Sequence, residues 1–301
     1  MNDYSFEGRV AIVTGAGRGI GRAYARLLAE RGASVVVNDL GGSMEGAGTD
    51  AGPASTVAAE IVAAGGNAVA DTSDVASAAG ATTLVETAVA RYGRVDIVIN
   101  NAGIIRWAGM PEVDEANLAS HLAVHVGGSF NTTHAAWPHM VEQSYGRIVM
   151  TSSSGMFGLP TNLSYATAKA AVIGMTNSLA VAGAAHDVKI NVIAPAAMTR
   201  MAGPGADDSA DGTPMAPALV APMVAYLAHE SCPVSGEVYA AGAGRFARIF
   251  IAQTKGYVHP TLDPTVEDVA EHWAAINDET GYTVPTDLIS WSNGFLAHQS
   301  R

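Results

Sequence analysis

Cysteine is nearly absent from this sequence, since its 301 residues contain only Cys232. A single thiol excludes an intrachain disulfide and a metal site built from several thiolates, so we expect no bound metal. It also favours a reducing compartment, and we expect a cytoplasmic protein. Charged residues are scarce at 15%, whereas apolar residues make up 49%, which is the balance of a globular protein rather than a disordered one.

Basic residues are the minority among the charges, with 16 Lys and Arg against 28 Asp and Glu, for a net charge of −12. Such a chain repels nucleic acid and anionic membranes at long range. No apolar run approaches the about 18 residues of a membrane-spanning helix, and the N-terminal segment lacks the pattern of a secretory signal peptide. We therefore expect neither nucleic acid nor a membrane as a partner.

Short β-rich segments alternate with Ala-rich helical segments along most of the chain. Strands that are apolar on both faces, such as Arg9–Thr14 and Ser34–Asn38, are typical of a parallel sheet covered by helices. The alternation predicts an α/β fold with a doubly wound parallel (Rossmann) sheet, over residues 1–246. We expect residues 247–301 to form a helical C-terminal extension packed on this single domain. The expected strands are 9–14, 34–38, 67–70, 96–100, 147–151, 189–193 and 237–240, and the expected helices are 20–31, 53–64, 76–92, 117–143 and 165–186.

A glycine-rich turn, Thr14–Gly21 (TGAGRGIG), joins the first predicted strand to the first predicted helix. Glycines let the backbone turn sharply and approach a pyrophosphate, while the helix N-terminus presents free N–H groups to it. The alternative is a simple strand-to-helix turn, but the flanking elements are those that a dinucleotide site requires. The residues expected to bind the cofactor here are Gly15, Gly17, Arg18, Gly19, Ile20 and Gly21.

Asp39 ends the second predicted strand, 18 residues after Gly21. A carboxylate at this position can accept hydrogen bonds from the adenosine ribose and repels the 2′-phosphate of NADP. Arg18 favours a phosphate, but Asp39 acts at closer range, so we predict NAD. Asp74 and Val75 follow the third strand and are candidates for the adenine pocket, with a helix N-cap as the alternative role of Asp74.

Tyr165 and Lys169 lie four residues apart at the start of a predicted helix, and therefore on one face. A nearby ammonium favours the phenolate, so Lys169 is expected to lower the pKa of Tyr165 toward working pH. The phenol could then exchange a proton with an alcohol or a carbonyl. Ser152, 13 residues upstream at the end of a strand, is the candidate that orients the substrate oxygen. An exposed helical pair is the alternative for Tyr165 and Lys169.

These motifs, with Asn101-Ala102-Gly103 after the fourth strand, together resemble the short-chain dehydrogenase/reductase family over about residues 6–245. The resemblance implies that Ser152, Tyr165 and Lys169 are catalytic. It also implies that Lys169 holds the nicotinamide ribose and that the Asn-Ala-Gly motif shapes the cofactor pocket. Further cofactor contacts are then expected from Pro195, Met198 and Thr199.

The chain departs from the family pattern in two places. His125 stands where a fourth catalytic residue, usually Asn, supports a proton relay, and Pro195-Ala196 replaces the usual Pro-Gly. His125 could serve that relay, or the relay could run through backbone carbonyls. His121 and His125 also have the i, i+4 spacing of metal ligands, but no neighbouring cysteine or third histidine supports a metal.

At both positions the chain resembles the (3R)-hydroxyacyl-CoA dehydrogenase module of peroxisomal multifunctional enzyme type 2. The likeness also includes Asn38–Gly42 and a helix expected to end at Trp273. The resemblance implies NAD-dependent oxidation of a 3-hydroxyacyl-CoA by a homodimer or homotetramer. A hydroxysteroid or terpenoid alcohol dehydrogenase is the alternative, and a non-catalytic nicotinamide-binding regulator is the rival of a different class. The cations considered for CoA are Arg106, Arg245, Arg248 and Lys255, with solvated or salt-bridged charges as the alternative.

Two segments have unusual composition. Leu40–Gly52 is a Gly-rich insertion after the second strand. Met201–Pro217 combines helix breakers with acidic residues, and either a substrate lid or a tolerated surface loop fits that composition.

Overall fold

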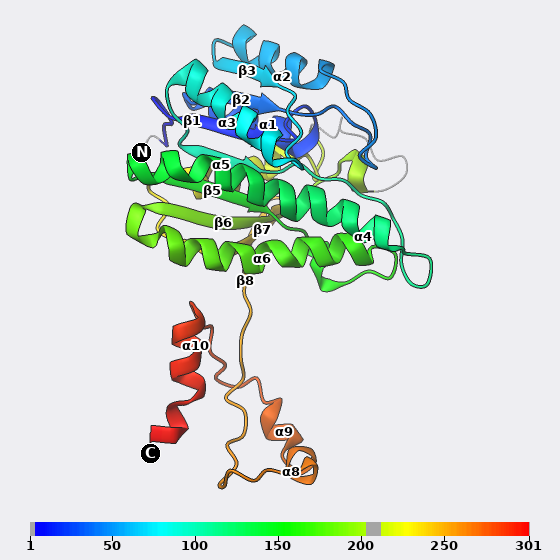
Figure 1. The fold of residues 1–301 in the computed structure, drawn as a ribbon, viewed down its shortest axis with the longest axis vertical. Coiled ribbons are helices and arrows are strands. Elements are labelled where there is room, and N and C mark those ends of the chain that lie inside the picture. The colour runs from blue at the N-terminus through cyan, green and yellow to red at the C-terminus, as the bar shows by residue number, and fades with distance from the viewer. Residues whose placement is uncertain (1–3, 203–211, 301) are drawn as a thin grey trace. The chain divides into compact units, whose positions relative to one another are not determined.

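The computed structural model describes residues 4–202 and 212–300, and the chain divides into two compact units, Met1–Arg248 and Ile249–Arg301. The first unit contains an eight-stranded sheet in the order β3-β2-β1-β4-β5-β6-β7-β8 (Figure 1). Strands β1 to β7 pair in parallel. The predicted doubly wound parallel sheet is therefore confirmed. The strands are β1 Val10–Thr14, β2 Ser34–Asn38, β3 Asn67–Asp71, β4 Ile97–Asn100, β5 Gly146–Thr151, β6 Val188–Pro195, β7 Val238–Gly242 and β8 Arg245–Ile249.

Helices cover both faces of this sheet, with α1, α2 and α7 in one layer and α3, α5 and α6 in the other (Figure 1). The central strands are buried on both faces because their side chains are apolar in both directions. Helix and strand ends differ from the predicted ones by at most three residues, close to the usual uncertainty at element ends. The α-helices of this unit are α1 Gly19–Glu30, α2 Gly52–Ala63, α3 Ala78–Tyr92, α4 Glu115–His121, α5 Gly128–Gln143, α6 Leu163–Gly183 and α7 Ala221–Ala228.

Three features of this unit differ from the sequence prediction. The single helix predicted over 117–143 is α4 and α5 joined by a turn of π-helix, η1, Leu122–Gly127. Helix α7 was not predicted, because its run of apolar residues has no helical periodicity. Strand β8 was also missed, because its sequence, RFARI, mixes charged and apolar residues at the edge of the sheet.

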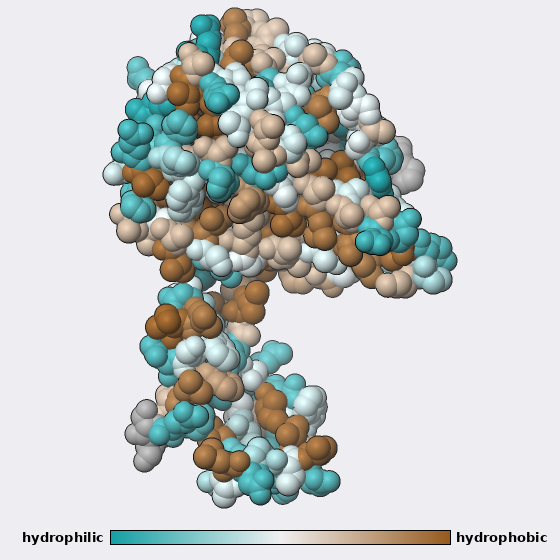
Figure 2. All heavy atoms as spheres, viewed as in Figure 1, coloured by the Kyte–Doolittle hydropathy of each residue, from teal (hydrophilic) through white to brown (hydrophobic). Residues whose placement is uncertain are grey.

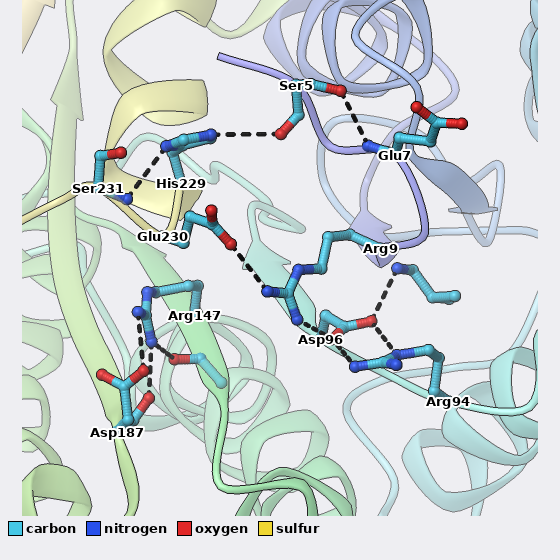
Figure 3. A network of polar contacts seen from close by, with 12 residues as sticks. Ser5, Glu7, Arg9, Arg94, Asp96, Arg147, Asp187, His229, Glu230 and Ser231 are labelled. Atoms are coloured by element: carbon cyan, nitrogen blue, oxygen red, sulfur yellow. Dashed lines mark hydrogen bonds and ion pairs between the residues drawn. The ribbon is translucent and has the colours of Figure 1, made fainter. Parts of the chain in front are cut away.

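The amino edge of the sheet is held by a network of charged side chains, of which Asp96 and Arg147 are buried (Figure 3). The Asp96 carboxylate, fully buried before β4, accepts hydrogen bonds from Arg9 Nη1 at 3.1 Å, Arg94 Nη2 at 2.6 Å and the backbone N–H of Val10 at 2.9 Å. Arg147 at the start of β5 pairs with Asp187 before β6 at 3.1 Å. The network joins the starts of four neighbouring strands, on the edge opposite the candidate site.

The second unit is helical but has no core of its own. It contains α8 Val266–Glu271, α9 Trp273–Ile276 and α10 Leu288–Phe295, so the helix expected to end at Trp273 ends at Glu271 and a new one begins at Trp273. None of residues 249–299 is buried. The predicted packing of this extension on the catalytic domain stays a prediction.

Two further observations concern the described part of the chain. No helix there is long and apolar enough to cross a membrane, and no group of three or more His, Cys, Asp or Glu side chains lies together as a metal site would need. Within the predicted loop Met201–Pro217, residues 203–211 lie outside the described residues. The lid prediction for this loop therefore stays a prediction.

Candidate active site

The predicted site residues lie on segments that follow the carboxyl ends of β1, β2, β4, β5 and β6. Parallel strands bring these ends to one edge of the sheet. The strand order reverses between β1 and β4, and ligands of such sheets bind in the crevice at that point.

The glycine turn between β1 and α1 is shaped by close backbone contacts. A Cβ on Gly21 would lie 2.2 Å from the carbonyl oxygen of Gly15, and one on Gly15 would lie 2.8 Å from the Cα of Ala102. Gly15 also has a φ of +61°, which L residues with side chains rarely adopt. Asn101 Nδ2 donates to the carbonyls of Thr14 and Gly15, each at 3.0 Å, and so holds the turn against the end of β4.

The N-terminus of α1 carries features that fit an anionic dinucleotide. Arg18 is its extended N-cap residue, and the Arg18 Nη1 atom is buried without a hydrogen-bond partner. A buried cationic nitrogen without a partner requires an ion, a ligand or water. Asp39 accepts hydrogen bonds from the backbone N–H groups of Gly17 at 2.8 Å and Gly41 at 2.7 Å. Gly15 to Gly21, Arg18 and Asp39 therefore lie together as predicted, and they fit a nicotinamide dinucleotide.

The segment after β3 places Val75 and Asp74 differently. Val75 is buried beside Gly128 at the start of α5, and its carbonyl accepts a hydrogen bond from Asn131. Asp74 is exposed and accepts from the backbone N–H of Ala76 at 2.9 Å. Ser77, not Asp74, is the N-cap of α3, so the alternative role considered for Asp74 is wrong.

Tyr165 and Lys169 lie in the first turns of α6, where the sequence predicted them. Lys169 is 3% exposed, and its Nζ donates to the carbonyl of Thr151 at 2.8 Å. The same Nζ lies 5.6 Å from the centroid of the Tyr165 ring. An exposed helical pair is therefore excluded for these two residues.

The expected lowering of the Tyr165 pKa by Lys169 is wrong for this structure. Burial raises the pKa of Tyr165, and a hydrogen bond with Ser153 only partly offsets that effect. Burial also lowers the pKa of Lys169 to about 7. The same desolvation thus disfavours both charges, and Lys169 is a weaker cation at neutral pH than the spacing argument assumed.

Ser153, rather than Ser152, lies beside the phenol. Ser152 is 1% exposed, and its hydroxyl donates to the backbone carbonyl of Lys169 at 2.8 Å, away from Tyr165. The Ser153 hydroxyl accepts a hydrogen bond from the backbone N–H of Gly155 at 3.0 Å, and both this hydroxyl and the edge of the Tyr165 ring lie beside Gly155. The prediction of Ser152 is therefore corrected to Ser153.

His121 and His125 stack on each other 5.9 Å apart, and both meet the Tyr165 ring edge-on, at 6.3 Å and 5.3 Å. His125 is 1% exposed, and its Nε2 hydrogen-bonds with the carbonyl of Ile104 at 2.8 Å, while its Nδ1 has no partner. Burial lowers the pKa of His121 and places that of His125 well below its usual value. Both lowered pKa values favour the neutral form of the two rings at pH 7. The turn of π-helix places His125 against the ring of Tyr165.

The remaining predicted residues are spread over several segments. Pro195 ends β6, the backbone N–H of Met198 donates to Met215 at 2.8 Å, and Thr199 Oγ1 accepts from Met201 at 3.3 Å. Their contacts with a cofactor stay predictions.

The cations considered for CoA do not form one described cluster. Arg248 pairs with Glu237 at 2.9 Å, and Arg106 Nε donates to the carbonyl of Glu45 at 2.7 Å. Arg245 and Arg248 belong to β8, whereas Lys255 belongs to the second unit. Contact of these residues with CoA stays a prediction.

Known proteins resemble this chain at both the sequence and the structure level. The short chain dehydrogenase family model matches residues 9–208. Peroxisomal multifunctional enzyme type 2 of Drosophila melanogaster is 45% identical over 277 residues, which cover 91% of this chain and 46% of that enzyme. A putative short-chain type dehydrogenase/reductase of Mycobacterium tuberculosis is 42% identical and is covered over 95% of its length. The chain thus spans about half the length of the Drosophila enzyme and nearly all of the mycobacterial protein.

Solved structures agree with the sequence matches. Full-length peroxisomal multifunctional enzyme type 2 from Drosophila melanogaster superimposes with a TM-score of 0.80 at 36% identity, over 98% of this chain and 50% of that one. A short chain dehydrogenase from Mycobacterium avium gives 0.77 at 35% identity, over 90% of this chain and 96% of that one. Together with the assembled tyrosine, lysine and serine, these matches place the chain in the short-chain dehydrogenase family, whose members are oxidoreductases using a nicotinamide cofactor.

Proposed function

We propose that this protein oxidises a (3R)-3-hydroxyacyl-CoA to the 3-ketoacyl-CoA with NAD. The observation that carries the proposal is the Tyr165 phenol, which lies with Ser153 beside Gly155 and one helical turn from a buried Lys169, at the same sheet edge as the glycine turn. The similarity to peroxisomal multifunctional enzyme type 2 from Drosophila melanogaster and Mus musculus, over at least 91% of this chain, supports the substrate class.

Each residue of the site has a distinct role in this reaction. The substrate hydroxyl binds between Ser153 and Tyr165, and the Ser153 hydroxyl fixes the position of its oxygen. In its phenolate form, Tyr165 accepts the hydroxyl proton while the C3–H bond breaks and the carbon–oxygen double bond forms. A bound oxidised nicotinamide would supply the acceptor for the hydride that leaves C3. Lys169 would hold the nicotinamide ribose, and its ammonium, 5.6 Å from the centroid of the Tyr165 ring, would favour the phenolate when it is protonated.

The preference for NAD over NADP rests on Asp39. Its carboxylate lies at the end of β2, held by the backbone N–H groups of Gly17 and Gly41. A carboxylate fixed at this place accepts hydrogen bonds from ribose hydroxyls and repels a 2′-phosphate.

Apolar residues on two loops support a substrate with an apolar tail. Trp107 and Met110 are 44% and 74% exposed after β4, and Phe157 and Leu159 are 72% and 49% exposed after β5. A bridge between Ala108 and Asn162 brings the two loops together near Tyr165. Exposed apolar groups gathered around a site are typical of ligand binding.

Hydrophobic residues also gather on the face formed by α5 and α6 (Figure 2). Phe130 on α5 is 52% exposed and Val181 on α6 is 60% exposed. This face supports the expectation of a homodimer or homotetramer. A cytoplasmic location stays a prediction.

The proposal is tested by following NADH formation with purified protein. The panel contains (3R)- and (3S)-3-hydroxyacyl-CoAs of several chain lengths and a set of steroid and terpenoid alcohols, each with NAD and with NADP. We expect turnover of the (3R)-thioesters with NAD. Turnover of steroid alcohols alone would replace the substrate by the alternative class, and no turnover of any alcohol would overturn the proposal.

The role of Tyr165 is tested separately with Tyr165→Phe, which removes only the phenolic oxygen. We expect turnover to fall by at least about a hundredfold, because general acid–base catalysis contributes that much, while NADH binding measured by fluorescence stays within twofold of wild type. Retained turnover in this variant would exclude Tyr165 as the base.

A further inference from the structure

The insertion Leu40–Gly52 is a compact loop with its ends fastened together. The backbone N–H of Asp50 donates to Leu40 at 2.9 Å, and the N–H of Ser43 donates to Ala47 at 2.8 Å. Gly41 has a φ of +77°, and a Cβ there would lie 1.9 Å from the carbonyl oxygen of Asp50. Loops of this kind are packed by their own groups and are frequently functional.

The tip of the insertion is bound to the segment that follows β4. The backbone N–H of Ile105 donates to the carbonyl of Met44 at 2.9 Å, and Arg106 Nε donates to the carbonyl of Glu45 at 2.7 Å. Gly46 lies so close to Ile104 that a Cβ on it would be 3.0 Å from that side chain. Three successive residues of the insertion thus contact three successive residues after β4.

The order of the strands determines which part of the sheet edge lies beneath the insertion. Strand β1 lies between β2 and β4, so a loop that leaves β2 and binds residues after β4 must pass the carboxyl end of β1. That end carries the glycine turn, whose Gly17 is joined through Asp39 to Gly41 at the base of the insertion. The insertion therefore spans the dinucleotide site from its adenosine side to the Asn-Ala-Gly segment.

We propose that Leu40–Gly52 is a clasp across the dinucleotide, and that Arg106 is the positioning residue that holds the clasp closed. The inference rests on the proposed function, because it assigns the insertion to the cofactor of that site. Arg106 acts through the Glu45 carbonyl rather than on the cofactor itself. Its backbone N–H also donates to His121 Nε2 at 3.2 Å, and its carbonyl accepts from Asn117 Nδ2, so the anchor of the clasp is fixed to α4. Release of the dinucleotide then requires these contacts to open.

The rate of NADH release, measured without substrate, tests the clasp. Stopped-flow fluorescence is used to follow displacement of NADH by excess NAD from the full-length protein. We expect Arg106→Gln to release NADH about tenfold faster, since one hydrogen bond from a charged group is lost. Arg91→Gln, which removes one exposed positive charge on α3, is the matched control and should release NADH as wild type does.

A second variant separates the clasp from direct contact between Arg106 and the cofactor. Gly46→Ala keeps Arg106 and Asp39 but strains the tip of the insertion, where Gly46 has a φ of +82° and a Cβ would lie 3.0 Å from Ile104, and the clasp predicts faster release here too. Faster release in Arg106→Gln with wild-type release in Gly46→Ala would make Arg106 a direct ligand and overturn the clasp. Circular dichroism and thermal melting verify that both variants are folded.

Limited proteolysis gives a readout that needs no bound dinucleotide. The clasp predicts faster cleavage within residues 43–48 in Arg106→Gln than in wild type, and protection by NAD in wild type. Equal NADH release rates in wild type and both folded variants would overturn the clasp and leave the proposed function intact. Failure of wild type to bind NADH at all would overturn both.

Discussion

Lys169 lies in a buried position that disfavours its charged form. Its side chain is 3% exposed, its Nζ donates to the carbonyl of Thr151, and burial lowers its pKa from 10.5 to about 7. A lysine in an unfolded chain has no such desolvation penalty. Folding at neutral to alkaline pH therefore releases a proton from this residue.

This proton release predicts how stability depends on pH. Between pH 7 and 10.5 the unfolded chain binds more protons at Lys169 than the folded chain does. The free energy of unfolding therefore rises with pH in this window, by up to about 1.4 kcal/mol per pH unit, and Lys169 contributes no slope below it. Urea denaturation from pH 6.5 to 9.5 should show the rise in wild type and its loss in Lys169→Met. If the free energy of unfolding depended on pH equally in both proteins, Lys169 would not have the lowered pKa assigned to it.

The two adjacent serines should behave differently when each is replaced by alanine. Ser153→Ala removes the hydroxyl beside Tyr165, and we expect kcat to fall by about a hundredfold or more. Ser152→Ala removes the hydrogen bond to the Lys169 carbonyl, which should lower the free energy of unfolding by about 1 kcal/mol with a much smaller effect on kcat. Steady-state kinetics and denaturation of both variants check this, and a larger loss of kcat in Ser152→Ala would reverse the assignment.

At the scale of elements, the turn of π-helix between α4 and α5 decides the geometry beside the phenol. Hydrogen bonds in a π-helix connect residues five apart, and such single turns are frequent at functional sites. Here Leu122–Gly127 carries His125, which hydrogen-bonds to Ile104 after β4 and meets the Tyr165 ring edge-on. The π turn thus ties the helix to the loop that follows β4.

Removal of this tie should destabilise the protein more than a matched change in the regular helix. His125→Ala creates a cavity and leaves the Ile104 carbonyl without its partner, so we expect a loss of about 2–4 kcal/mol in the free energy of unfolding. His134→Ala, in an exposed part of α5, should change it by less than about 1 kcal/mol. Denaturant unfolding of both variants is the measurement, and equal losses would mean that the π turn has no special structural role.

At the scale of the whole molecule, much apolar surface is left uncovered by one chain. The second unit exposes large side chains, among them Trp273 at 60% and Leu288 at 73%, and none of residues 249–299 is buried. Helices as short as α8, α9 and α10 are not stable in isolation. The described residues of this unit therefore give its short helices no packed core.

The apolar face of α5 and α6 predicts the outcome of an association experiment. Phe130→Glu and Val181→Glu would place charges in the proposed subunit interface, and we expect the dissociation constant of the oligomer to rise at least about tenfold for each. Val62→Glu changes an apolar residue on α2 that is similarly exposed, at 54%, and serves as the control. Sedimentation velocity at micromolar concentrations measures the change. If all three variants associated as wild type does, the subunit interface would lie on another face.

The sequence by itself determined the sheet, the nucleotide turn and most of the site. Period and composition identify buried strands, because a strand covered on both faces must be apolar throughout. Glycines mark the turn, because no other residue allows the backbone of Gly21 to approach Gly15 as it does. The spacing of Tyr165 and Lys169 placed both residues on one helical face, since that relation is local.

Only the tertiary structure decided the features that depend on long-range contacts. The hydrogen bond from Ser152 to the Lys169 carbonyl leaves Ser153 beside Tyr165, and burial lowers the pKa of Lys169. The π turn at His125 and the crossing of β1 by the insertion also depend on partners distant in sequence, such as Ile104 and Arg106. Local patterns report the backbone preferences of neighbouring residues. The direction of a side chain and the cost of burying its charge depend on residues that meet only after folding.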